Sequence, residues 1–258
     1  MVGPARPDGK HEVATVLQRL ALCDRVRVEP APRLTVRGFA GDTLVGDALR
    51  RLAAEARVEP AWEATIEKKL PVAAGLGGGS SDAATALRLA NAMLPEPLPP
   101  ERLRALAAGL GADVPFFLVQ GPHLGTGDGS ELAPLDLPQD YWVLLLLPAG
   151  AAKASTAAVY GAFDGRGGEE GFAARRDALV SALDRARRAR DLAALPRNDL
   201  AASPLAAELE ERGAFRADVT GAGPVVYGLF LHRDTAAAAR RALRGRGRTW
   251  LTVPAWYG

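Results

Sequence analysis

A run of glycines and serines, Gly75 to Ser81, carries the strongest chemical signal in this sequence. Because glycine has no Cβ atom, the backbone can turn tightly there and direct several N–H groups at one anion. A helix that begins directly after the run would add the positive end of its dipole. The hydroxyls of Ser80 and Ser81 could bind phosphate or a magnesium-bound water. The run therefore predicts a phosphate-binding loop.

The loop differs from two familiar glycine motifs. No Gly-Lys-Ser/Thr sequence closes it, which excludes a Walker loop, and Ser80 stands where a dinucleotide fingerprint has its last glycine. The alternative is a flexible turn that joins a strand to a helix and binds nothing. The alternation of Trp62, Ala64 and Ile66 predicts a strand before the loop. Together with a helix after the loop, this strand favours the phosphate site.

Helices are predicted on the C-terminal side of the loop. Apolar residues recur at helical spacing over 84–93, and Ser80 or Ser81 could cap the first turn. A further helix is predicted over 100–110, with Gly111 ending it.

An aspartate in the segment Gly111-Ala-Asp113-Val-Pro-Phe-Phe117 is the second signal. Held between a glycine and a proline, its carboxylate could orient or deprotonate a hydroxyl nucleophile. Phosphoryl transfer needs little beyond positioning, charge neutralisation and such a group. Alone, Asp113 would more often be a helix cap or a turn residue, and the phosphate loop favours the catalytic role.

A second glycine turn, Thr220-Gly-Ala-Gly223-Pro224, lies between two predicted strands. Such a turn more often only closes a hairpin, so its signal is weak.

The second half of the chain has the element order of a ferredoxin-like domain. The order strand, helix, strand, strand, helix, strand defines that arrangement, and it is predicted from strands at 141–147, 215–219, 225–231 and 249–253 and helices at 172–188, 201–212 and 235–243. We place a boundary within 137–140, which gives domains of residues 1–138 and 139–258. Residues 151–168 are expected to form a loop.

Composition and charge narrow the classes of protein. With 48% hydrophobic and 24% charged residues, the 258-residue chain is typical of soluble globular proteins. A net charge of +2 without a basic run argues against nucleic acid as the main partner. The strongest apolar run is too short to span a bilayer, and we expect a cytoplasmic protein. Cys23 is expected to be a buried thiol, and the three scattered histidines predict no metal site.

These segments, in this order, resemble the GHMP small-molecule kinase superfamily over most of the chain. The loop and the Gly111–Phe117 segment are the most specific of the five matching regions, which are 6–12, 71–84, 111–117, 198–200 and 220–224. The resemblance is greatest to the branch that phosphorylates the 2-hydroxyl of a cytidine diphosphate-linked methylerythritol in the non-mevalonate isoprenoid pathway. It implies an α+β fold with an N-terminal α/β domain that carries the phosphate loop and a C-terminal ferredoxin-like domain.

The resemblance also implies roles for individual residues, with ATP and Mg²⁺ as cofactors. Asp113 would be the catalytic aspartate, His11 and Lys10 would lie in the cytidine pocket, and Tyr160 would stack on cytosine or be an ordinary core tyrosine. Asn198 would lie at the pocket rim or cap a helix. The ATP-binding residues would be Pro71, Val72, Ala73, Ala74, Gly75, Leu76, Gly77, Gly78, Gly79, Ser80 and Ser81. No metal ligand, nucleic acid or membrane partner is implied, and the protein would be a monomer or a homodimer.

The sequence departs from the family pattern in three places. The family begins with a Lys-x-Asn strand, and we expect that strand to be encoded upstream of Met1. Lys10 stands where a tyrosine would face cytosine, although a cation over the base could replace the ring. Gly221-Ala-Gly223 lacks the hydroxyl of a glycine-serine-glycine sequence.

Three functions are therefore weighed. The first is a working kinase, favoured by the intact loop and Asp113. The second is a pseudokinase or nucleotide-binding protein without turnover. The third is a GHMP kinase for a different alcohol, which Lys10 keeps open.

Overall fold

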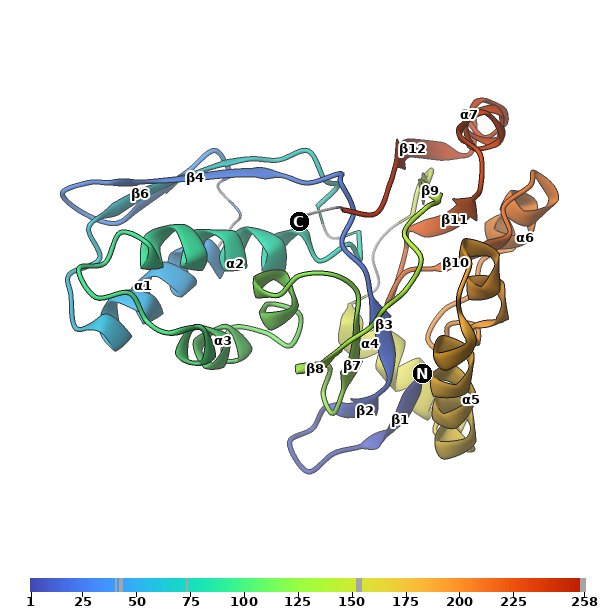
Figure 1. Cartoon of the computed structure of the whole chain (residues 1–258), viewed down its shortest axis with the longest axis horizontal. Helices are drawn as coiled ribbons and strands as arrows, with labels where there is room; N and C mark the ends of the chain where they lie inside the picture. Colours follow the sequence, from blue (N-terminus) through green and yellow to red (C-terminus); the bar gives the residue numbers. More distant parts are fainter. Residues whose placement is uncertain (40, 42–43, 73, 152–154, 256–258) are drawn as a thin grey trace. The chain divides into compact units, whose positions relative to one another are not determined.

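A computed structural model gives the structure of the chain and describes residues 1–39, 41, 44–72, 74–151 and 155–255. The chain forms two compact units, and Figure 1 labels their elements. The first unit comprises Met1–Ala21, Ala73–Leu76 and Gly121–Gly258, and the second comprises Leu22–Val72 and Gly77–Gln120. Each unit is described by itself below.

In the second unit, helices cover one side of a sheet with the strand order β4-β6-β5 (Figure 1). Strand β4 pairs antiparallel with β6, and β5 pairs parallel with it. The predicted strand before the loop and the predicted helix at 100–110 are confirmed. The elements are β4 Arg25–Pro30, β5 Thr35–Arg37, α1 Leu44–Ala56, β6 Trp62–Glu67, α2 Gly78–Asn91, α3 Pro100–Ala108 and the 3-10 helix η1 Pro115–Leu118.

Helix α2 is held in the core of this unit by small apolar side chains. Ala83, Ala84 and Ala86 are fully buried, and they let α2 pack closely against α1. Leu49 and Leu87 belong to the same core. Burying each leucine contributes about 1.5–3 kcal/mol. The packing therefore fixes the position of the N-terminus of α2 within the unit.

The start of α2 differs from the prediction that Ser80 or Ser81 caps it. Gly77 is the N-cap, with a left-handed φ of 66° and no side-chain cap, and the N–H of Ser81 donates to the Gly77 carbonyl at 2.9 Å. Both serines therefore lie inside the first turn, and the capping prediction was wrong. The left-handed conformation, which glycine adopts without strain, lets the helix begin at Gly78.

The first unit contains the predicted ferredoxin-like sheet. Its strand order is β10-β11-β9-β12, and every neighbouring pair is antiparallel. Helices α6 and α7 contact these strands and lie beside the sheet in Figure 1. The elements are β9 Trp142–Pro148, α6 Pro204–Glu211, β10 Arg216–Val219, β11 Val226–Phe230, α7 Arg233–Ala242 and β12 Gly247–Thr252. This arrangement confirms the element order predicted from the sequence.

Two smaller sheets belong to the same unit. Strand β1 pairs with β2, and the other sheet has the order β3-β7-β8. The remaining elements are β1 Val2–Ala5, β2 His11–Val13, β3 Thr15–Leu17, β7 His123–Thr126, β8 Glu131–Pro134, α4 Thr156–Asp164, α5 Phe172–Arg185 and the 3-10 helix η2 Ala189–Ala194.

Helix α4 corrects the expectation that residues 151–168 form a loop. The side chain of Ser155 caps the helix by accepting the N–H of Ala158 at 3.1 Å. Phe163 is 1% exposed and packs with Val2 and Val13. The helix is short and buries little else, so its apolar pattern in the sequence is weak.

The two compact units divide the chain elsewhere than the boundary placed after residue 138. Strands β7 and β8 pair with each other, and β7 pairs with β3 near the N-terminus. Residues 1–21 and 121–138 therefore group with the C-terminal half, through pairing between distant segments. The division into residues 1–138 and 139–258 stays a prediction.

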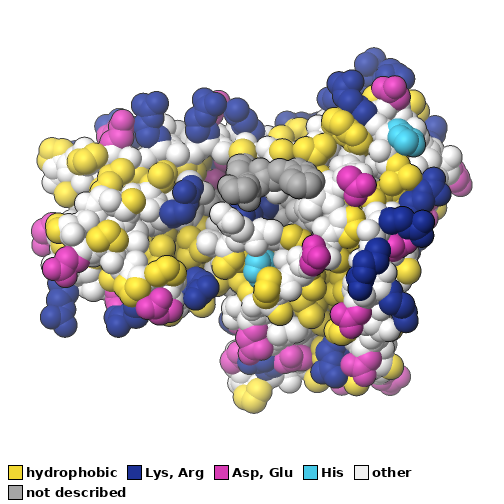
Figure 2. Space-filling model, in the orientation of Figure 1, with side chains coloured by type: hydrophobic (Ala, Val, Ile, Leu, Met, Phe, Trp, Pro, Cys, Tyr) yellow, Lys and Arg dark blue, Asp and Glu magenta, His cyan; other side chains and the backbone are white. Residues whose placement is uncertain are grey.

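Cys23 is exposed, which overturns the expectation of a buried thiol. It lies in the irregular link before β4, where no helix or strand turns it toward the core. Figure 2 shows Asp and Glu side chains interspersed among the Lys and Arg side chains of the visible face. In the part of the chain that the structure describes, no helix is long and apolar enough to span a bilayer.

Candidate functional site

The N-terminus of α2 offers backbone N–H groups to an anion. The first N–H groups of any helix lack intrahelical partners, and the helix dipole adds positive potential there. Gly79 lies in this first turn, and apart from its chain neighbours and the backbone of its own helix, no described atom comes within 4 Å of the place that a Cβ atom on it would occupy. Nothing in the described fold therefore requires glycine at this position. The free space next to the N–H groups fits a phosphate.

The preceding arm of the loop, Ala74–Leu76, is held by the turn that follows β10. The Thr220 hydroxyl donates to the Gly75 carbonyl at 3.3 Å. A Cβ atom on Gly75, whose φ is +76°, would lie 2.6 Å from the Gly223 carbonyl oxygen. The Thr220–Pro224 turn therefore contacts the loop as well as joining two strands, which its weak sequence signal did not predict.

Asp113 is exposed and lies in a turn directly before η1. The N–H of Val114 donates to the Gly111 carbonyl at 3.1 Å and closes this turn. A few residues later, the Phe117 ring comes within 3.0 Å of the position of a Cβ atom on Gly77. The structure thus brings the Asp113 segment against the start of α2 within one unit.

An ion cluster that the sequence analysis missed lies beside the first turn of α2. The Lys68 ammonium binds the carboxylates of Asp24 and Asp82, with 2.9 Å between Nζ and Asp82 Oδ2. The side chains of Asp24 and Asp82 are 1% and 4% exposed. Burial lowers the pKa of Lys68, but the hydrogen bonds to both carboxylates outweigh burial, so the net pKa is raised.

Asp24 also anchors the backbone that enters the loop. Its Oδ1 accepts the N–H groups of Lys69 and Leu70, at 2.6 and 2.8 Å. A Cβ atom on Gly78 would lie 3.4 Å from Asp24 Oδ2 and 3.5 Å from Lys68 Nζ. The lysine therefore compensates two carboxylates that would otherwise repel an anion at the N-terminus of α2. Asp82, at the end of the glycine-serine run, was the signal available in the sequence.

His11 and Tyr160 lie against each other in the first unit. Their ring centroids are 4.7 Å apart, with an angle of 40° between the ring planes. His11 Nε2 lies 2.7 Å from Asp164 Oδ1, and Phe163 contacts the imidazole edge-on. Two residues that are distant in the sequence, both predicted to bind the substrate base, are thus brought together.

Lys10 is turned toward a different partner. Its ammonium pairs with Asp128, in the turn between β7 and β8, and its side chain is 53% exposed. The hydrogen bond from Lys10, and then those from Ser130, lower the pKa of Asp128 to about 2. The ion pair holds the turn at residue 10 against the β7–β8 turn, and among the residues that the structure describes no aromatic ring contacts the Lys10 ammonium.

Of the other residues predicted to bind ATP, Pro71 and Val72 enter the loop, and Val72 is 57% exposed. Ala73 lies outside the described residues. No group of three or more His, Cys, Asp or Glu side chains suited to a metal ion occurs in the described ranges.

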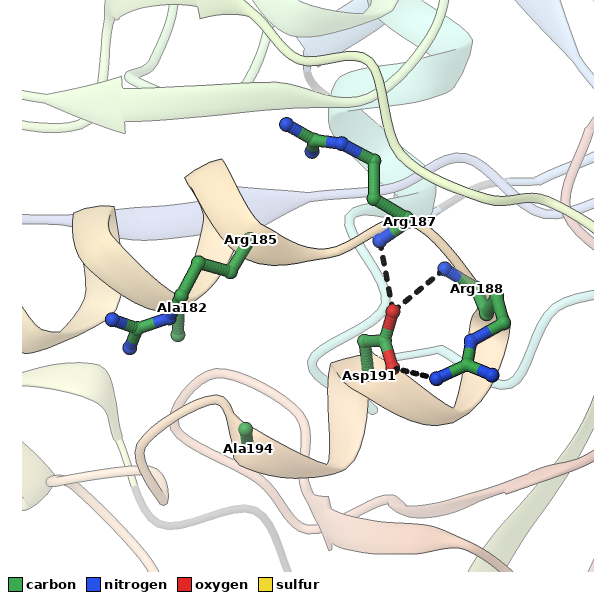
Figure 3. Close-up of a pocket in the computed structure, with 6 residues that line it drawn as sticks. All are labelled: Ala182, Arg185, Arg187, Arg188, Asp191 and Ala194. Atoms are coloured by element: carbon green, nitrogen blue, oxygen red, sulfur yellow. Dashed lines mark hydrogen bonds and ion pairs between the residues drawn. The ribbon is translucent and has the colours of Figure 1, made fainter.

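A pocket of about 440 Å³ near the end of α5 contains none of the predicted site residues (Figure 3). Asp191 accepts the backbone N–H groups of Arg187 and Arg188 there, at 2.9 and 2.8 Å. The carboxylate therefore serves the local turn.

The fold and the glycine-rich helix start define a class, the small-molecule kinases of the GHMP type. The family model "GHMP kinases N terminal domain" matches residues 43–121, and "GHMP kinases C terminal" matches residues 175–249. The chain belongs to the GHMP kinases, and it is a kinase by that membership.

Curated relatives of the chain include 4-diphosphocytidyl-2-C-methyl-D-erythritol kinases. That of Nocardia farcinica is 40% identical, with 95% of this chain and 86% of the relative covered. That of Geobacter sulfurreducens is 36% identical, with 96% and 91% covered. These matches confirm the predicted family and the predicted branch within it.

Solved structures agree with this assignment. A crystal structure of 4-(cytidine 5'-diphospho)-2C-methyl-D-erythritol kinase matches with a TM-score of 0.80 and 30% identity, covering 99% of this chain and 95% of that one. A mevalonate kinase matches with a TM-score of 0.77 at 12% identity, with 94% and 93% covered, which shows the shared fold. The α+β two-part fold predicted from the sequence is thereby confirmed.

Proposed function

We propose that this kinase transfers the γ-phosphoryl group of ATP to the 2-hydroxyl of 4-diphosphocytidyl-2-C-methyl-D-erythritol. The names of the relatives support the substrate. The observation that carries the chemistry is the contact of Phe117 with the start of α2, because it joins the Asp113 segment to the phosphate-binding helix in one unit.

The proposed roles follow from the chemistry of each group. Asp113 orients the substrate hydroxyl and takes its proton while the hydroxyl oxygen forms its bond to phosphorus. The bond from the γ-phosphorus to the bridging oxygen breaks, and ADP leaves with that electron pair. The N–H groups of the first turn, including that of Gly79, stabilise the charge on the phosphoryl oxygens.

The serines of the first turn suit a magnesium-bound ligand. Hydroxyls of Ser80 and Ser81 can bind phosphate or a metal-bound water, and a bound Mg²⁺ would neutralise part of the phosphate charge. Asp24 and Asp82 already bind the Lys68 ammonium, so we do not assign either carboxylate as a ligand of Mg²⁺. We place the reaction in the cytoplasm, where ATP is available.

For the second substrate, we propose that His11 recognises the cytosine and Tyr160 provides a face for stacking. The 2.7 Å contact with Asp164 supports an oriented imidazole. Lys10 stands where the family has a tyrosine that faces cytosine. Its pairing with Asp128 supports a role in holding the turn between β1 and β2.

The proposal is tested by coupled ADP release from purified protein, ATP and Mg²⁺. The substrates compared are 4-diphosphocytidyl-2-C-methyl-D-erythritol, mevalonate and homoserine, with a chelator as the magnesium control. Turnover only with the cytidine-linked alcohol is expected.

Each other outcome has a defined meaning. Turnover of mevalonate or homoserine instead would make this a kinase for another alcohol. ATP binding without turnover of any substrate would favour the pseudokinase.

A further inference from the structure

Asn198 is bonded to the turn that holds the phosphate loop. Its Nδ2 donates to the carbonyl oxygens of Val219 and Gly221, both at 2.8 Å. Its Oδ1 accepts the N–H of Leu200 at 2.8 Å. Helix α6 has Ser203 as its N-cap, so Asn198 does not cap that helix. The polar atoms of the side chain instead form hydrogen bonds with two backbone segments, Val219–Gly221 and Leu200.

A side chain on strand β10 also holds the backbone of Asn198 through a hydrogen bond. Asp218 on β10 accepts the N–H of Asn198 at 2.9 Å through Oδ2 and that of Val219 at 2.8 Å through Oδ1. Arg216 donates to the same Oδ2 at 3.4 Å and to the Tyr227 hydroxyl at 3.1 Å. The Arg216 and Asp218 side chains are 6% and 8% exposed. Asn198 is thus attached to a buried polar network with its partners in place.

The two carbonyls that Asn198 binds belong to the residues on either side of Thr220. Thr220 in turn donates its hydroxyl to the Gly75 carbonyl at 3.3 Å. A Cβ atom on Gly75 would lie 3.1 Å from the Thr220 carbonyl oxygen and 2.6 Å from that of Gly223. With backbone packed this closely, a shift of the turn must move the loop arm Ala74–Leu76.

We infer that Asn198 is a positioning residue for ATP. It holds the Val219–Gly221 backbone so that the loop arm keeps its phosphate-binding conformation. The inference rests on the proposed binding of ATP by this loop. Because Asn198 acts through the turn and through Gly75, its loss weakens ATP binding and leaves the chemical step unchanged.

The sharpest test is Asn198→Asp, which is isosteric. It keeps the acceptor for Leu200 but turns a carboxylate oxygen toward two carbonyl oxygens. We expect the Kd of a non-hydrolysable ATP analogue, measured by calorimetry, and the KM for ATP to rise about tenfold, as the loss of two hydrogen bonds allows. The kcat and the KM for the second substrate should stay within about twofold.

Asn91→Asp is the matched control. Asn91 bonds Leu98 in the same manner, with Nδ2 at 3.0 Å from the carbonyl oxygen and Oδ1 at 2.8 Å from the N–H. It is the last residue of α2, at the end opposite the glycine turn. Its variant should lower the Tm similarly and leave ATP affinity unchanged.

A second pair of variants decides the question if Asn198→Asp does not fold. Asn198→Ala and Thr220→Val act on one turn, so their effects on ATP affinity should be less than additive in the double variant. Unchanged analogue affinity in folded Asn198 variants, or a lower kcat at unchanged affinity, overturns the inference. If the wild type binds the analogue but does not turn over the cytidine-linked alcohol, the proposed substrate fails while these affinities still decide the role of Asn198.

Discussion

The ring of Phe117 comes within 3.0 Å of the place that a Cβ atom on Gly77 would occupy. Gly77 is therefore restricted twice, by this ring and by its left-handed φ of 66°. The contact connects two segments, the glycine-serine loop and the Asp113 segment. The sequence indicated a role for each of them but did not show that they lie against each other. It also makes their proposed roles open to separate tests.

Replacing Asp113 should remove the chemical step alone. In Asp113→Asn, kcat should fall about a hundredfold to ten-thousandfold, because the carboxylate that takes the proton becomes an amide. The Kd of an ATP analogue should stay unchanged, because the helix N–H groups remain in place. Steady-state kinetics and calorimetry check both. Asp177→Asn, at an exposed carboxylate of α5, is the control, and a parallel loss of analogue binding in Asp113→Asn would contradict the assigned role.

Gly79→Ala should separate ligand binding from folding. Since no described atom beyond its chain neighbours and its own helix backbone lies within 4 Å of the added methyl group, the free energy of unfolding should be unchanged or rise by about 0.5–1 kcal/mol, as for glycine to alanine in a helix. The methyl group would occupy the proposed phosphate space, so the Kd for the analogue should rise by about tenfold or more. Urea unfolding and calorimetry measure the two effects.

Gly77→Ala gives the contrasting result. Its left-handed φ and the Phe117 contact should cost about 1–2 kcal/mol of stability. If Gly79→Ala is stably folded and binds the ATP analogue with unchanged affinity, the proposal that phosphate binds at this turn is contradicted.

Lys68→Met should destabilise the protein by about 3 kcal/mol at neutral pH, because it leaves two buried carboxylates without their cation. The pKa of Lys68 is raised, so the ion cluster stabilises the fold fully below the ordinary value of 10.5. That stabilisation is lost as the pH rises through the raised value. The difference between wild type and variant should therefore persist from pH 7 to about pH 10 and shrink above it. Chemical unfolding across this range is the measurement.

The neighbouring Lys69→Met controls for the charge. The Lys69 ammonium makes no ion pair with a described residue, so its variant should change stability little. Equal losses in the two variants would contradict the cluster.

Lys10→Met should lower the free energy of unfolding at neutral pH but not in acid. The pKa of Asp128, about 2, lies below its ordinary 3.8, so the ion pair stabilises the fold above the ordinary value and is lost as the pH falls toward 2. Because Lys10 is more than half exposed, the loss at pH 7 should be about 0.5 kcal/mol. Unfolding measured at pH 7 and near pH 2 compares the two, and an equal difference at both values would refute the ion pair as its source.

The predictions from the sequence succeeded where the signal is local. The period-two strand at β6, the helical spacing of apolar residues that begins at Ala84 in α2 and the element order of the ferredoxin-like half all depend on residues close in the chain, and the structure contains these elements. The start of α2 was misplaced because a left-handed glycine cap leaves no polar side-chain signature. Helix α4 was missed because its burial depends on Phe163 meeting strands from the other end of the chain.

By itself, the sequence determined the class of this protein, since glycines and serines before a helix and an aspartate between glycine and proline are local patterns of phosphoryl-transfer chemistry. Only the tertiary structure decided which residues the functional side chains contact. Lys68 binds carboxylates 44 and 14 residues away, His11 meets Asp164 across 153 residues, and Thr220 reaches Gly75 across 145. A hydrogen bond depends on distances within about 3.5 Å, and sequence spacing carries no such information once the chain has turned back on itself.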